Sequence, residues 1–162
     1  MHRRLVVDAC VLQAAGETEH PTSQSCGRVL MEVFECRHKA VVTPAIQAEW
    51  DAHESRFAVA WRMRMAGRGL LARQPDVADR KLRERIETGL DSTQDRAAAL
   101  KDVHLIEAAQ QTDRAVLSHD RRARALFAKV SGAPPLLCKI AWVDPVAYCD
   151  SATAWLRAGA RW

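Results

Sequence analysis

The stretch that decides the fold is residues 101–120, which read KDVHLIEAAQQTDRAVLSHD. Its first part is strongly helical, and its apolar residues recur at helical spacing on the same face as Asp102. Ala115-Val116-Leu117-Ser118 follows as a short strand, and Asp120 comes one residue after it. The block therefore predicts a helix and a strand, each of which carries or delivers an acidic residue.

Three other short apolar runs predict strands outside this block. Residues 3–7 end at Asp8, residues 40–43 precede Pro44, and residues 139–143 form a late strand. Helical segments separate these runs from one another. Because strands that alternate with helices pair in parallel, the sequence predicts an α/β fold with a mainly parallel sheet and helices on both faces.

The helices are predicted from apolar residues that recur every three or four positions. One begins at Thr22 or Ser23 as its N-cap and ends near His38, and a long helical stretch from Ile46 to Met65 is broken by Gly67 and Gly69. Further helices are expected at residues 76–88, 96–112, 121–130 and 146–157, and residues 131–135 form the clearest loop.

Length and composition favour one globular domain covering residues 1–162. The chain is 48% hydrophobic and 27% charged, which is enough to bury its own core. No apolar run approaches the roughly 18 residues that a membrane span requires, so we expect a cytoplasmic protein. The five cysteines are scattered without a C-x-x-C pair, which favours neither a disulfide framework nor a closed zinc site.

The basic residues favour a nucleic-acid partner. The net charge is +4, and 19 arginines stand against five lysines; the planar fork of arginine suits phosphate groups. Residues 56–85 hold nine basic and three acidic residues, and within them we expect Arg62, Arg64 and Arg68 to bind substrate. A solvated helical face explains the same cluster equally well.

Acidic residues fall at the positions where ligands gather in a parallel sheet, beyond the carboxyl ends of the strands. Asp8 and Asp120 follow strands, and Glu49 lies in the first turns of the helix after the second strand. Helical spacing directs Glu49 and Asp102 inward, whereas Glu107 is expected to face outward. The four inward acids are therefore candidates for one shared site.

Several carboxylates directed at one place call for a compensating cation, because each is costly to remove from water. An all-oxygen ligand set favours Mg²⁺ or Mn²⁺ over zinc. Each acid also has a structural alternative. Asp8 could cap a turn, Asp102 and Asp120 could stabilise helix N-termini, and Glu49 could pair with a buried arginine.

Taken together, the four acidic motifs resemble the PIN-domain family. That family has an Asp after the first strand, an acidic residue in the helix after the second, an Asp opening a later helix, and an Asp just beyond the next strand. The matching segments here are Leu-Val-Val-Asp8, Thr-Pro-Ala-Ile-Gln-Ala-Glu49, Lys-Asp102-Val-His-Leu-Ile-Glu-Ala-Ala and Ala-Val-Leu-Ser-His-Asp120-Arg-Arg-Ala-Arg.

The resemblance covers nearly the whole chain and implies a three-layer α/β/α sandwich with magnesium-dependent RNA cleavage. Many members of the family are toxins held by a cognate antitoxin, so RNA, an antitoxin and a second copy of the chain are candidate partners. Two residues depart from the pattern. Cys10 stands where Asn or Ser often supports the metal site, and His119, which could touch substrate phosphate, replaces Asn or Arg.

Three functions are compatible with these residues. The first is a metal-dependent endoribonuclease, as a toxin or as a housekeeping enzyme, with Asp8, Glu49, Asp102 and Asp120 as metal-binding and catalytic residues. The second is a PIN-fold RNA-binding protein with a weak or vestigial metal site. The third is a phosphatase or other small-molecule hydrolase, which the absence of a D-x-D pair after the first strand disfavours.

Overall fold

A computed structural model describes residues 2–130 and 135–161 of the chain. Within these residues, five strands form a single parallel sheet in the order β3-β2-β1-β4-β5. The strands are β1 (Arg4–Val7), β2 (Lys39–Val42), β3 (Leu71–Arg73), β4 (Ala115–Leu117) and β5 (Ala141–Val143). Because every pair is parallel, the carboxyl ends of all five strands meet at one edge of the sheet.

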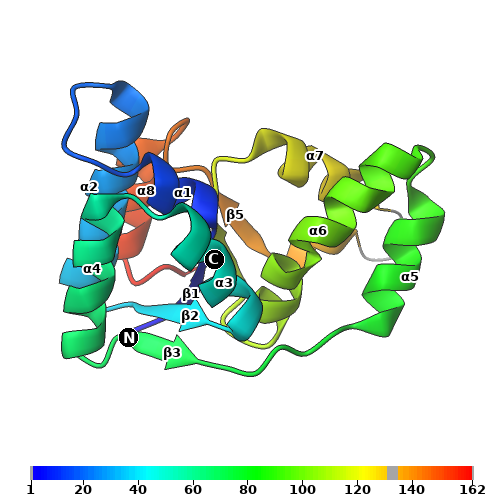
Figure 1. Ribbon diagram of the computed structural model, residues 1–162, viewed down its shortest axis with the longest axis horizontal. Coiled ribbons are helices and arrows are strands. Elements are labelled where there is room, and N and C mark those ends of the chain that lie inside the picture. The colour runs from blue at the N-terminus through cyan, green and yellow to red at the C-terminus, as the bar shows by residue number, and fades with distance from the viewer. Residues whose placement is uncertain (1, 131–134, 162) are drawn as a thin grey trace.

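Helices cover both faces of this sheet and complete a three-layer α/β/α sandwich. Figure 1 shows α2, α4 and α8 on one side and α5, α6 and α7 on the other. The helices are α1 (Ala9–Ala14), α2 (Pro21–Glu35), α3 (Pro44–His53), α4 (Arg56–Gly67), α5 (Arg80–Gly89), α6 (Thr93–Gln110), α7 (Arg121–Lys129) and α8 (Cys149–Arg157), with a 3₁₀ turn η1 (Leu136–Lys139). The predicted α/β class is confirmed.

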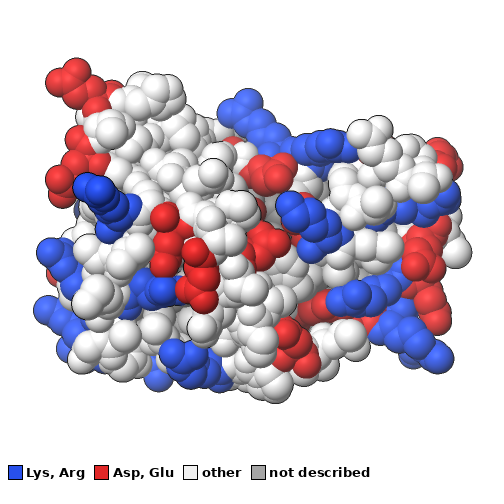
Figure 2. Space-filling model, in the orientation of Figure 1, with Lys and Arg blue, Asp and Glu red and all other residues white. Residues whose placement is uncertain are grey.

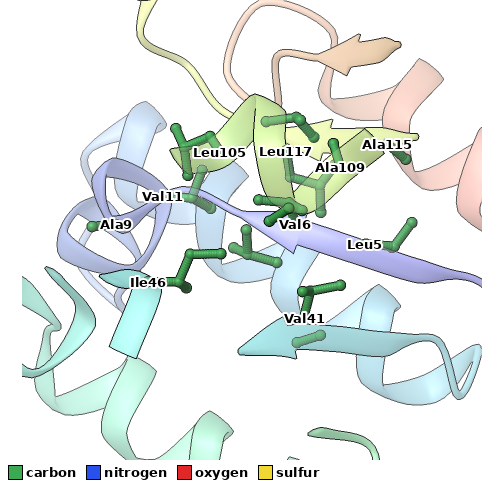
Figure 3. Packing of buried hydrophobic residues seen from close by; sticks show 14 of the residues in the cluster. Leu5, Val6, Ala9, Val11, Val41, Ile46, Leu105, Ala109, Ala115 and Leu117 are labelled. Atoms are coloured by element: carbon green, nitrogen blue, oxygen red, sulfur yellow. The ribbon is translucent and has the colours of Figure 1, made fainter. Parts of the chain in front are cut away.

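The core forms where α6 packs on the two central strands. Leu5, Val6 and Val7 of β1 are fully buried, which explains why this run is apolar on both faces. Figure 3 shows Leu105 and Ala109 of α6 lying against the sheet beside β4. Each fully buried aliphatic side chain contributes roughly 1.5–3 kcal/mol of hydrophobic stabilisation, so α6 is firmly held in place.

The expected long helix from Ile46 to Met65 is two helices. The chain turns extended at Glu54, and Ser55 then caps α4 by accepting a hydrogen bond from the backbone N–H of Ala58 at 3.1 Å. The apolar stripe continues through the break because α3 and α4 both bury a tryptophan there, and the indoles of Trp50 and Trp61 meet edge to face. The stripe alone therefore concealed the boundary.

Several local details also differ from expectation. The short helix α1 and the edge strand β3 were not predicted, and α2 begins at Pro21 with His20 as its N-cap in place of Thr22 or Ser23. Apart from Pro135, the expected loop at residues 131–135 lies outside the described residues. The five cysteines are free thiols. Among the described residues, no helix is long and apolar enough to cross a membrane.

Glu107 does not face outward, and this prediction was wrong. Its side chain is 6% exposed, and its carboxylate accepts hydrogen bonds from Nε of Arg83 at 2.7 Å, Nη2 of Arg83 at 2.8 Å and the backbone N–H of Asp79 at 2.9 Å. The physical reason is that α5 packs against the face of α6 that a helical projection assigns to solvent.

Candidate active site

Asp8 is held at the carboxyl end of β1 by three hydrogen-bond donors. Its carboxylate caps α1 by accepting from the backbone N–H of Cys10 at 3.3 Å, and it also accepts from the Cys10 thiol at 3.2 Å and the Ser118 hydroxyl at 2.6 Å. The capping role expected as the structural alternative is therefore real. Asp8 also accepts from Ser118, which follows β4, and helix capping alone does not require this contact with a second strand end.

Ser118 joins the ends of β1 and β4. Its fully buried hydroxyl donates to Oδ2 of Asp8 and accepts from the backbone N–H of Asp120 at 3.1 Å. The carboxylate of Asp120 accepts from the backbone N–H of Ala123 at 2.8 Å and so caps α7. The sequence analysis treated Ser118 only as the last residue of a strand. Its position two residues before Asp120 is the signal that could have identified it as a residue of the site.

Asp102 enters the same site from α6. Burial and the charge of Asp8 raise the pKa of its carboxyl to about 6, with a further increase from Asp120 and partial opposition from Lys101 and His104. No hydrogen bond or ion pair among the described residues engages this carboxylate. Asp8, Asp102 and Asp120 therefore form one electrostatically coupled set, which agrees with the prediction that Asp102 faces inward.

Glu49 reaches this edge of the sheet through its neighbour Trp50. The indole N–H of Trp50 donates to the backbone carbonyl of Val7 at 2.9 Å, which fixes α3 beside the residue that precedes Asp8. The Glu49 side chain is half-buried, and no hydrogen bond or ion pair within the described part of the chain engages it. Its helix therefore lies at the edge of the sheet where Asp8 is found, but among the described residues no hydrogen bond joins Glu49 to the three aspartates.

The donor set suits a hard cation by its charge and chemistry. In the described arrangement, no three His, Cys, Asp or Glu side chains lie close enough together to hold a metal ion. The fit rests instead on Asp102, an unpaired and partly buried carboxylate that two others repel. A divalent cation bound to these oxygens would relieve that repulsion, and oxygen ligands favour Mg²⁺ or Mn²⁺.

Cys10 and His119, the two departures from the family pattern, contact each other. A ring N–H of His119 at Nε2 donates to the backbone carbonyl of Cys10 across 3.0 Å. Burial and the charge of Asp8 raise the pKa of the Cys10 thiol well above its ordinary value, so the thiol remains protonated and donates to Asp8. Cys10 thus supports Asp8 as a hydrogen-bond donor.

The basic segment of residues 56–85 is not one surface in space. Figure 1 places α4 and α5 at opposite ends of the molecule. Arg62 is paired with Asp51 at 2.6 Å and Glu54 at 2.9 Å, and the guanidinium of Arg68 lies over the ring of Phe34 at 4.3 Å.

Arg64 is exposed and lines a cavity of about 780 Å³, which lies between the α1–α2 connection and α4. None of the four acids lines this cavity. Among the contacts of the described residues, none joins Arg62, Arg64 or Arg68 to the four acids.

Figure 2 shows acidic side chains in the middle of the visible face, between the α1 and α3 side and the α6 and α7 side, with basic side chains over α7. Comparisons of this chain with family models, curated proteins and solved structures found no match. The PIN-domain resemblance therefore rests on the sequence motifs.

Proposed function

We propose that this chain is a metal-dependent endoribonuclease of the PIN-domain type, which hydrolyses phosphodiester bonds in RNA. The observation that carries the proposal is the Ser118 hydroxyl, which donates to the Asp8 carboxylate and accepts from the backbone N–H of Asp120, while the charges of Asp8 and Asp120 both raise the pKa of the unpaired Asp102 carboxyl. Structural capping explains Asp8 and Asp120 separately. It does not explain why a third, unpaired carboxylate lies close enough for both charges to raise its pKa.

The chain's own groups would divide the work as follows. Asp8, Asp102, Asp120 and Glu49 would hold Mg²⁺ or Mn²⁺. Such an ion, when bound, lowers the pKa of a coordinated water and offsets charge on the leaving oxygen. Ser118 and the Cys10 thiol fix the orientation of Asp8, and the first turn of α7 fixes Asp120. Asp102 and Glu49, which carry no such fixing contacts, are free to turn toward a ligand.

The test is cleavage of labelled single-stranded RNA by purified protein with Mg²⁺ or Mn²⁺ and with chelator. We expect cleavage that requires the ion, and near-complete loss of cleavage in D8N, E49Q, D102N and D120N. Double variants should be scarcely worse than single ones, because each acid serves the same arrangement.

The matched control for the acidic variants is D51N. Asp51 is an exposed carboxylate on α3, two residues from Glu49, and it pairs with Arg62 outside the acidic edge. D51N should cleave normally. Cleavage that persists in chelator, or four acidic variants that keep most of their activity, would sink the proposal.

A second function, RNA binding without cleavage, is favoured by two contacts to one carboxylate oxygen. Two donors, the Ser118 hydroxyl and the Cys10 thiol, already engage Oδ2 of Asp8, so that oxygen has less capacity left for a metal ion. The two functions differ in one measurement. Wild-type protein that binds RNA but leaves it intact with either ion would support the binding protein.

A toxin role, with an antitoxin as partner, is a narrower form of the proposal. It would appear as growth arrest on expression of the wild type, relieved in D8N and by co-expression of a small protein encoded next to it. An active nuclease without growth arrest would favour a housekeeping role.

A further inference from the structure

We propose that the exposed face of α7 is the surface that binds the phosphate backbone of single-stranded RNA and leads it to the acidic edge. This inference rests on the proposed function and changes where the substrate is held: the cations concerned are Arg121, Arg122, Arg124 and Lys129, not the arginines of α4.

The composition of α7 separates an apolar face from a wholly basic one. Ala123, Leu126 and Phe127 are buried against the protein, while all four cations are exposed. No acidic residue occurs between Arg121 and Lys129, so nothing within the helix neutralises them. Four positive charges in a helix of nine residues equal the net charge of the entire chain, which is +4.

Helix stability does not account for this pattern. Arg121 and Arg122 occupy the first turn of α7, where the helix dipole disfavours positive charge. Acidic residues are the stabilising choice at that position, and the first turn has none. Cations that oppose the helix dipole call for another role, and binding of an anion supplies one.

The intramolecular partners of these arginines are loose. The guanidinium of Arg121 lies 3.7 Å from the Asp144 carboxylate and that of Arg122 lies 3.6 Å from the Asp95 carboxylate, with 78% and 59% of their side chains exposed. By contrast, Arg62 pairs with Asp51 at 2.6 Å. Asp144 itself is buried, and its other carboxylate oxygen accepts from the backbone N–H groups of Val146 and Ala147. Because both guanidinium groups are exposed and both distances are long, each pair contributes little energy, so Arg121 and Arg122 can exchange them for phosphate.

The position of α7 gives this surface its relation to the site. Asp120 caps the helix, so the first two arginines follow the candidate catalytic acid directly. On the other side Lys101 is the neighbour of Asp102 and acts on its charge. Figure 2 shows basic side chains over α7 beside the acidic side chains in the middle of the face. Phosphates held on α7 would therefore place an adjacent phosphodiester at the acidic edge.

The experiment measures binding in chelator, so that cleavage does not interfere. Fluorescence anisotropy of a labelled single-stranded RNA is recorded across salt concentrations for wild type and for the variant R121Q/R122Q/R124Q. We expect affinity to fall at least tenfold and the slope of log affinity against log salt to flatten by about 2, since each phosphate contact on a single strand contributes about 0.7. Thermal unfolding should show no loss of stability.

A matched control removes the same charge at the opposite edge of the sheet. Arg37, Lys39 and Arg114 are exposed and lie at the amino ends of β2 and β4. The variant R37Q/K39Q/R114Q should keep wild-type affinity and slope. Equal losses in both variants would mean that only overall charge matters, and would overturn the proposal.

The rival surface is tested in the same assay with R64Q/R68Q. If this α4 variant loses affinity while the α7 variant binds like wild type, the α7 assignment is wrong but the ribonuclease proposal stands. If the wild type neither binds nor cleaves RNA, both proposals fail together. Loss of affinity confined to the α7 variant supports the inference whether or not cleavage is observed.

Discussion

Replacing Asp102 with asparagine should stabilise the metal-free protein while removing the proposed RNA cleavage. Burial and the charges of Asp8 and Asp120 raise the pKa of the Asp102 carboxyl from 3.8 to about 6. One pKa unit corresponds to about 1.4 kcal/mol, so the ionised group costs the folded state at most about 3 kcal/mol. Because the side chain is only partly buried, water screens some of this cost, and we expect a gain of about 1–2 kcal/mol.

The gain should depend on pH in a defined direction. For an acid whose pKa is raised on folding, the cost is absent at pH values below its ordinary 3.8, where folded and unfolded chains both hold the proton. The cost is complete above about 6, where both forms are ionised. The stability advantage of D102N should therefore be small near the ordinary pKa and grow as the pH rises toward neutrality.

Urea unfolding in chelator measures this effect. At neutral pH D102N should unfold at a higher urea concentration than wild type, with a rise in melting temperature of about 2–8 °C. Added Mn²⁺ should raise the stability of the wild type through binding to the folded state and leave D102N almost unchanged. The control is D95N on the same helix, where a first-turn acid paired with Arg122 is lost and stability should fall slightly.

Two results would refute this reasoning. If D102N is less stable than wild type at neutral pH in chelator, Asp102 is a favourable structural group and is not repelled by its neighbours. If the stability difference is the same at low and at neutral pH, the difference has a cause other than ionisation of this carboxyl.

Three further predictions concern positions that the fold brings together. E107Q should lose about 1–3 kcal/mol of unfolding free energy in urea, because the partly exposed Arg83 loses its buried partner, whereas E84Q, on the exposed face of α5, should change little. S118A should lower Mn²⁺ affinity about 10–100-fold in calorimetric titration, because Asp8 loses an orienting donor. S118T, which keeps the hydroxyl, should restore most of this affinity. Equal affinity in S118A and wild type would show that the hydroxyl is dispensable. Burial lowers the pKa of His38 below its ordinary 6.5, so as the pH falls the unfolded chain takes up the proton before the folded chain does. The free energy of unfolding should therefore fall as the pH drops below about 6.5, and the difference in this free energy between wild type and H38N should shrink over that range. A constant difference would contradict the assignment.

The strand ends and the inward face of the helix at residues 96–112 were predictable because they follow from local patterns. A strand such as β1 is short, apolar and followed by Asp8, and the parallel arrangement then fixes which edge the acid occupies. The same reasoning placed Asp102 on the buried face of α6, and the charge coupling between Asp102 and Asp8 agrees with it.

The failures have a common origin in packing between elements. The helical projection that directed Asp102 inward also directed Glu107 outward, yet α5 covers that second face. Periodicity identifies an apolar stripe, but it does not show how many neighbours a helix has. The apolar stripe from Ile46 to Met65 concealed a helix boundary for a related reason, since two helices packed on the same core carry the same pattern.

By itself, the sequence determined the α/β class, the parallel sheet and the edge at which Asp8 and Asp120 lie, because each depends on spacing along the chain or on a single strand end. Only the tertiary structure decided that Ser118 joins Asp8 to Asp120 and that the basic segment of residues 56–85 divides between opposite ends of the molecule. Contacts between residues more than a hundred positions apart, such as the 2.6 Å hydrogen bond from Ser118 to Asp8, depend on which strands become neighbours. That choice is made by the packing of the whole core and leaves no local periodicity in the sequence.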